Sequence, residues 1–229
     1  MNATSTGRRE LRAANFWQST NGKKIVMGVT GAILFAFVTG HMLGNLQVFA
    51  GPEHLNAYGH LLHAVGELLW PVRAVLLLTV ALHVTASVQL WLLNRKARPV
   101  AYSRKEAIAA SYASRTMYWS GPLILAFLIF HLLQFTAGVV HPGGPFIAGD
   151  VYHNVVAGFR VWWVSAWYIV TMCLLGLHLS HGIAALFQSL GLSHPRYTPL
   201  VKKAAVVIAT LIVLGFISVP ISVLLEVVK

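Results

Sequence analysis

Five long apolar segments, separated by shorter polar ones, dominate the pattern of this chain. A helix that crosses a membrane needs about 20 mostly apolar residues. We therefore expect an all-α integral membrane bundle of five transmembrane helices, over approximately residues 25–49, 68–93, 117–140, 161–190 and 204–228. Residues 1–24 are polar and basic, as is typical of an interfacial segment before a first span. Residues 1–229 would then form one transmembrane domain.

Composition supports a membrane protein and excludes a disulfide-stabilised secreted domain. Of 229 residues, 57% are hydrophobic and 10% are charged, whereas soluble domains have about 25% charged residues. The single cysteine, Cys173, lies within the fourth apolar segment, so no disulfide framework is possible.

Basic residues gather on one side of the predicted membrane. Fourteen of the 17 Lys and Arg residues lie in the N-terminal segment or in the loops after the second and fourth spans. Because Lys and Arg are enriched in cytoplasmic loops, we expect a cytoplasmic N-terminus and a multi-pass protein of the inner membrane. The net charge of +11 is then a topology signal. Membrane lipid is expected as a partner and nucleic acid is not.

Four of the five apolar segments each hold a histidine in their interior: His41, His83, His131 and His178. An imidazole in hydrocarbon is costly and usually functional. From the helical rise, His41 and His131 lie about 25 Å from the inner boundary, and His83 and His178 lie about 18 Å from it. Ligands at equal depth on different helices suit an iron between them. The sequence therefore predicts an outer haem held by His41 and His131 and an inner haem held by His83 and His178.

Two other interpretations of these histidines stay open. They could be intramembrane side chains whose nitrogens bond to hydroxyl or carbonyl groups. They could also serve a proton or metal transporter, but transporters usually place carboxylates near the midplane as well. Here all the acidic residues lie at or beyond the ends of the predicted spans: Glu10, Glu53, Glu67, Glu106, Asp150 and Glu226.

Several residues near the four histidines are candidates for the surroundings of a haem. Gly28 and Gly31 lie on a glycine-rich first span, where a flat group or another helix can approach the backbone closely. His181 lies one turn beyond His178 on the same predicted helix face. Possible donors to anionic propionates, judged by depth, are Arg115, Ser120, Arg160 and Tyr168.

Nearly the whole chain resembles the dihaem cytochrome b membrane anchor of succinate:quinone oxidoreductases, the b558-type family of succinate dehydrogenase and fumarate reductase with one five-helix subunit. The motifs that carry the resemblance are NGKKIVMGVTGAILFAFVTGHMLGNLQVFAG at 21–51, NAYGHLLH at 56–63, SRTMYWSGPLILAFLIFHLLQFTAG at 114–138 and FRVWWVSAWYIVTMCLLGLHLSHGIAALFQSLGLSHPRY at 159–197.

The resemblance implies a function in a respiratory complex. His41, His83, His131 and His178 would be axial ligands of two b haems, and His178 precedes Gly182 by four positions, as the family's ligand precedes a glycine. A flavoprotein and an iron–sulfur subunit would bind on the cytoplasmic face. Succinate would be oxidised on the flavoprotein, so this chain would hold no catalytic residue for that step. It would pass electrons from the iron–sulfur subunit through two haems to menaquinone or ubiquinone, within the respiratory chain and the tricarboxylic acid cycle.

One residue departs from the pattern of some fumarate-reducing relatives. They carry a glutamate two residues before the fourth-span ligand, which serves transmembrane proton movement, whereas this chain has Gly176. We therefore expect succinate oxidation in place of fumarate reduction. A cytochrome b of another complex, such as a hydrogenase or formate dehydrogenase, is a further alternative.

The quinone site is expected near the outer boundary. Glu67 and Tyr58 lie there, where a quinone oxygen needs a proton partner. A solvated Glu67 in the first turn of the second span is the simpler interpretation of this residue. An inner site near Arg115, Trp119 and Ser120 is the main rival location.

Overall fold

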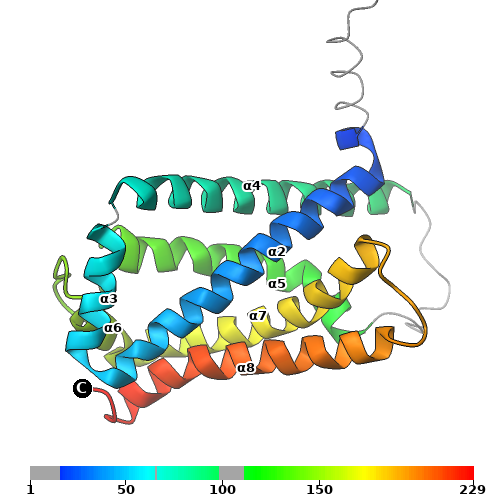
Figure 1. Cartoon of the computed structure of the whole chain (residues 1–229). Coiled ribbons are helices and arrows are strands. Elements are labelled where there is room, and N and C mark those ends of the chain that lie inside the picture. Colours follow the sequence, from blue (N-terminus) through cyan, green and yellow to red (C-terminus); the bar gives the residue numbers. More distant parts are fainter. Residues whose placement is uncertain (1–15, 65, 98–110) are drawn as a thin grey trace, which may run out of the picture.

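The protein is described here from a computed structural model, which covers residues 16–64, 66–97 and 111–229. All regular structure in these ranges is helical. Five long helices lie side by side and form the bundle (Figure 1): α2 (Thr20–Asn45), α4 (Gly66–Lys96), α5 (Tyr112–His131), α7 (Trp162–Ser189) and α8 (Thr198–Leu224). Each is long and apolar enough to cross a membrane. The expected all-α bundle is therefore confirmed for the described residues, with five helices that could each span a membrane by length and composition.

The two ends of the bundle differ. The short helices α3 (Pro52–Ala64) and α6 (Val151–Arg160) cover one end, where the chain also terminates (Figure 1); we call it the cap end. The opposite end, which we call the basic end, carries the charged termini of the long helices: Lys23, Lys24, Arg95, Lys96, Arg115, Lys202 and Lys203. Other residues of the predicted basic cluster lie outside the described residues, namely Arg8, Arg9, Arg12, Arg98, Arg104 and Lys105.

Several helix ends differ from the predicted spans. The first span, expected at 25–49, is α2 followed by the 3-10 turn η1 (Leu46–Ala50). Gly51 at φ 96° ends this turn, and Pro52 suits the first position of the next helix. Of the predicted interfacial segment, residues 1–15 lie outside the described part of the chain. Residues 20–24 belong to α2, and the Lys23 ammonium donates to the backbone carbonyls of Trp17 and Gln18.

The third and fifth spans are displaced toward the basic end. Helix α5 passes into a single π-turn, η2 (Leu132–Thr136), and the chain leaves the helix at Gly138, where φ is 62°. The span therefore ends before residue 140. Helix α8 begins at Thr198, not at 204, because Pro199 fits a first helical turn and the lysine side chains of the next turn can reach water.

Helices α3 and α6 occupy segments that the hydropathy pattern treats as outer loops. Asp150 caps α6 by accepting a hydrogen bond from the His153 N–H at 2.9 Å, and it accepts another from Asn56 of α3 at 3.0 Å. Asn56 in turn accepts from the Tyr152 N–H at 2.9 Å. These hydrogen bonds hold the pKa of the Asp150 carboxyl below its ordinary value. The cap end is thus a folded layer.

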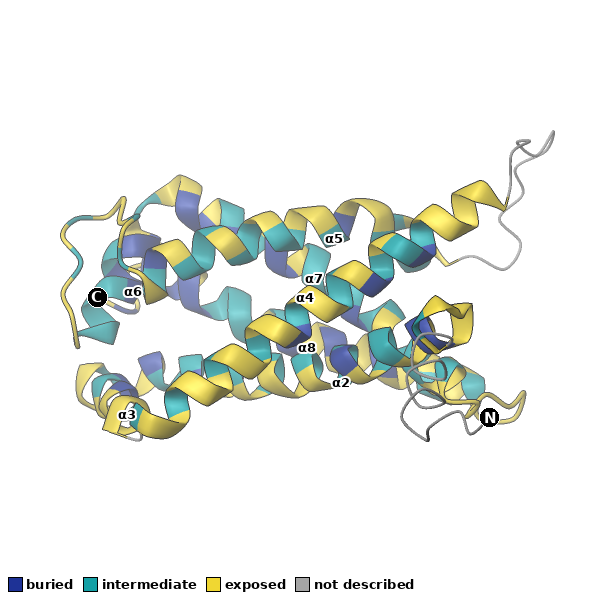
Figure 2. Ribbon diagram, turned by 90° about the horizontal axis from the view of Figure 1, so that it is seen from above, coloured by how far each residue is buried: buried dark blue, intermediate teal, exposed yellow. Residues whose placement is uncertain are grey.

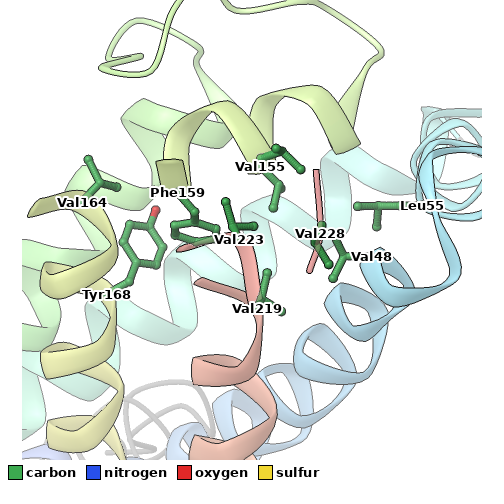
Figure 3. Packing of buried hydrophobic residues seen from close by; sticks show 10 residues of the cluster. Val48, Leu55, Val155, Phe159, Val164, Tyr168, Val219, Val223 and Val228 are labelled. Carbon is green, nitrogen blue, oxygen red and sulfur yellow. The ribbon is translucent and has the colours of Figure 1, made fainter. Parts of the chain in front are cut away.

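The best-buried apolar cluster lies beneath this cap layer. It joins η1, α3, α6, α7, α8 and the C-terminal residues (Figure 3) through side chains such as Val48, Leu55, Phe159, Val223 and Val228. Along the middle of the bundle, by contrast, many outward-facing apolar side chains are exposed (Figure 2), as lipid-facing positions should be. The backbone groups there are paired within the helices, which a bilayer requires.

Helices α7 and α8 approach each other closely at Gly176. A Cβ atom at this position would lie 2.6 Å from Val213 Cγ2, which is closer than van der Waals contact permits. Gly176 therefore forms part of a helix–helix contact. A larger residue at this position would require the Val213 side chain to move.

Gly176→Ala is expected to destabilise the bundle. Overpacking by one methyl group costs about 1–3 kcal/mol when a branched neighbour such as Val213 must move. Gly40→Ala is the matched control, since a Cβ atom at Gly40 would have nothing within 4 Å and alanine favours a helix over glycine by about 1 kcal/mol. Thermal unfolding in detergent should give a lower midpoint for Gly176→Ala only. Equal midpoints for both variants would contradict the packing argument.

Candidate functional site

The four intramembrane histidines meet in two pairs. The rings of His41 on α2 and His131 on α5 lie 5.7 Å apart between centroids, at an interplanar angle of 82°. The rings of His83 on α4 and His178 on α7 lie 6.3 Å apart, at 52°. We call them the cap pair and the basic-end pair. These are the partners that the depth count predicts, whereas the role of the histidines as ligands stays a prediction.

Both separations suit two imidazoles on opposite sides of one metal ion. A metal–imidazole bond of about 2.0–2.1 Å places the two ring centres roughly 6.4 Å apart, because each nitrogen lies a little over an ångström from its ring centre. The 6.3 Å of the basic-end pair matches this value, and the 5.7 Å of the cap pair is somewhat shorter. Within the described residues, no three His, Cys, Asp or Glu side chains gather to hold an ion. Each pair thus offers two imidazole groups at most, a number that a bis-histidine haem would use.

Aromatic side chains enclose the cap pair. Phe37 stacks on His41 with ring centroids 5.5 Å apart, and Phe127 stacks on His131 at 5.8 Å. Phe135 contacts His131 edge-on at 5.7 Å. The stacking residues each precede their histidine by four positions, so one helix face carries both rings. The cap pair therefore has an apolar surrounding that limits how the imidazoles can turn.

A hydroxyl group holds the ring nitrogen of one histidine in the cap pair. The Tyr168 hydroxyl lies 3.2 Å from His131 Nδ1 and donates to Gln134 Oε1 at 2.9 Å. Tyr168 and Gln134 are both buried. Since the phenol proton is directed at Gln134, the hydroxyl oxygen faces His131 as an acceptor.

The basic-end pair shows the same arrangement with a threonine. Thr30 Oγ1 donates to the Val26 carbonyl at 2.7 Å and lies 3.1 Å from His83 Nδ1, so it too faces the imidazole as an acceptor. Gly31 leaves room for this ring, because a Cβ there would be 3.3 Å from His83 Cε1.

The environment of His178, the other member of the basic-end pair, suits a ligand better than a structural histidine whose nitrogens are hydrogen-bonded. His178 Nδ1 is buried and has no hydrogen-bond partner in the described chain. Gly182, one turn further along α7, is exposed, and a Cβ there would have nothing within 4 Å. The hydroxyls of Thr30 and Tyr168 contact His83 and His131 at Nδ1, and within the described residues no hydrogen bond engages Nε2 of either histidine. The buried, unpaired nitrogen leaves His178 without the hydrogen bond that a purely structural histidine would make.

The remaining candidates on the first span and at the basic end are spread out. A Cβ on Gly28 would meet Leu186 of α7 at 3.3 Å, so this glycine serves a helix contact. Arg115 is exposed, with its guanidinium over the Tyr112 ring. Ser120 is fully buried, and its hydroxyl has no partner among the described residues. His181 is half-buried on α7, one turn closer to the basic end than His178.

Three other candidates lie toward the cap end. Arg160 is exposed at the end of α6, and Glu67 lies in the first turn of α4, at the membrane boundary. Tyr58 of α3 packs against α2, where a Cβ on Gly44 would be 2.8 Å from its hydroxyl. Gly44 lies almost one turn beyond His41, so Tyr58 is close in height to the cap pair. The structure thus brings Tyr58, but not Glu67, up to the helix that carries His41.

Several groups of the site were not predicted from the sequence. Thr30, Gln134 and Phe127 were not singled out, although each contacts a histidine or its partner. A usable signal existed for two of them: Phe127 and Gln134 lie four residues before and three residues after His131, on its helix face. Thr30 is 53 residues from His83 in the chain, and only the packing of α2 on α4 reveals it.

No protein-family model, curated protein or solved structure matches the chain.

Proposed function

We propose that this chain is the membrane-anchor and electron-transfer subunit of a succinate dehydrogenase, carrying two b haems between an iron–sulfur partner and a membrane quinone. The observation that carries the proposal is the meeting of four intramembrane histidines in two pairs at bis-imidazole spacing. The family resemblance of the sequence supports the choice of complex.

His41 and His131 would hold one haem, and His83 and His178 the other. Bound haem b supplies a one-electron redox centre whose potential depends on its ligands and surroundings. The chain's own residues supply two neutral nitrogens per iron, an apolar enclosure and hydroxyl groups that orient the imidazoles. Because two protein nitrogens would hold each iron, the site would suit electron transfer and not oxygen binding.

The two ends of the bundle would serve different partners. The basic end would face the cytoplasm and bind the iron–sulfur and flavoprotein subunits of an inner-membrane complex. The cap end would receive the quinone near Tyr58 and Glu67. The close contact of Gly176 with Val213 disfavours a larger residue at this position, and the absence of a glutamate there supports the expectation of succinate oxidation.

Two b haems per polypeptide are expected, held without covalent bonds because the chain lacks a CxxCH motif. A pyridine haemochrome assay on the purified full chain measures this ratio independently of enzyme activity. One haem or none per chain would refute the proposal. Copurification of a subunit with covalent flavin would separate a succinate dehydrogenase from a hydrogenase or formate dehydrogenase cytochrome. Zinc or proton transport without a haem spectrum would indicate the transporter alternative.

A further inference from the structure

The buried hydrogen bonds beside the cap pair form a directed chain from His131 to the cap layer. Tyr168 Oη lies 3.2 Å from His131 Nδ1 and donates its proton to Gln134 Oε1 at 2.9 Å. The Tyr168 hydroxyl has only one proton, which it donates to Gln134. In the hydrogen bond with His131 it must therefore accept, and Nδ1 must be the donor. The neutral imidazole then keeps its other nitrogen, Nε2, as an unprotonated lone pair.

Packing holds Tyr168 and Gln134, the two residues that determine the direction of these hydrogen bonds, in place. Phe127 and Phe159 contact the Tyr168 ring edge-on, each with centroids 4.8 Å apart; Figure 3 shows Phe159 beside Tyr168. Gln134 is only 2% exposed. Its amide nitrogen lies against Gly158, where a Cβ would be 2.7 Å away.

The hydrogen bond from Tyr168 uses the Gln134 oxygen, and the Gln134 amide nitrogen has no partner among the described residues. The residue lines a cavity of about 10 Å³ under the cap layer, together with His141, Asn154 and Gly158. A volume of that size holds about one water molecule, which can accept a hydrogen bond from the amide nitrogen. The opposite amide orientation would reverse every donor in the chain and place the His131 proton on Nε2.

We infer that Tyr168 and Gln134 are positioning residues that hold His131 in the tautomer protonated at Nδ1, with Nε2 free to bind iron. The inference rests on the proposed function for its purpose, but the tautomer is a property of the chain itself. A hydrogen bond donated by the far ring nitrogen also raises the electron density of a ligating imidazole. Tyr168 and Gln134 would therefore lower the reduction potential of the haem at the cap pair.

The first test measures the tautomer by nitrogen NMR. The full chain is labelled with ¹⁵N-histidine and purified without added haem in lipid nanodiscs, and His131→Ala identifies the His131 signals. The wild-type signal should show Nδ1 protonated. In Gln134→Leu, the Tyr168 proton loses its acceptor and should turn to His131, moving the imidazole proton to Nε2. Tyr152→Phe, which removes a hydroxyl bonded to the Lys229 carbonyl, is the matched control and should change nothing.

A second variant, Gly158→Ala, tests the inference independently in case Gln134→Leu does not fold. Gly158→Ala places a methyl group against the end of the flexible Gln134 side chain and should displace the amide while sparing the fold. It should shift the His131 tautomer in the same direction as Gln134→Leu. A wild-type His131 protonated at Nε2, or a tautomer unmoved by both variants, would overturn the inference.

The second test uses the haem-loaded chain. Redox titration should show an upward shift of one b-haem midpoint in Tyr168→Phe and Gln134→Leu, and a shift of the other midpoint in Thr30→Val. Haem that binds with potentials unmoved by Tyr168→Phe and Gln134→Leu would refute the inference and leave the proposed function intact. Failure of the chain to bind haem would refute the proposed function, while the tautomer result would still test the inference.

Discussion

Replacing His83 with alanine should remove one of the two b haems and leave the other in place. The haem content should fall from two to one per chain, because the lost imidazole would remove one of the two protein ligands proposed for that iron. His178→Ala should deplete the same spectral component, since its ring lies 6.3 Å from that of His83. His41→Ala and His131→Ala should deplete the other component. Reduced-minus-oxidised spectra at low temperature resolve the two.

His181→Ala is the control for these replacements. His181 is half-buried on α7 and lies one turn from His178, so its loss removes an imidazole from the same helix without touching either pair. Both haems should remain. Depletion of one component by both His83→Ala and His131→Ala would show that the histidines do not act in the pairs that their ring distances indicate.

The helices that cross the membrane could be predicted because their signal is local. Each span has no charged residue in its middle, and hydropathy alone places it. Helices α3 and α6 could not be predicted in this way. Their apolar faces, with Leu55 and Val155 buried, pack on the ends of other helices, so their stability comes from contacts that no local window contains. The early end of the third span depends on the positive φ of Gly138. A glycine permits this conformation, but its presence in the sequence does not predict it.

In the candidate site, too, only the features that depend on local signals could be predicted from the sequence. The partners within each histidine pair followed from helical rise and alternating direction, which are properties of any antiparallel bundle. The groups that orient the imidazoles did not follow from depth. Thr30 and Tyr168 lie at suitable heights, as do several other hydroxyls, and only the rotation of each helix about its axis decides which one faces a ring. Depth alone suggested Tyr168 for a propionate, whereas the structure directs its hydroxyl to Gln134 and His131.

The second large effect is expected at the proposed quinone site, from replacement of Glu67. Glu67 lies in the first turn of α4, where a carboxylate can exchange protons with water and face a quinone headgroup at the membrane boundary. Tyr58 packs on α2 close to the height of the cap pair, so a quinone beside it would be near the redox centre proposed there. Both residues belong to the cap end, on the opposite side from the proposed docking face.

Glu67→Gln should lower the rate of quinone reduction by the intact complex by about 10²-fold or more, the usual contribution of a positioned acid or base. Haem content and succinate oxidation with a soluble dye should stay unchanged, because neither uses this carboxyl. Glu53→Gln is the matched control, since Glu53 also lies in a first helical turn at the cap end and should not affect quinone reduction. Steady-state assays with a short-chain quinone measure the effect. Equal quinone kinetics in both variants would remove Glu67 from the site, and a quinone analogue that crosslinks only near Arg115 and Trp119 would place the site at the basic end.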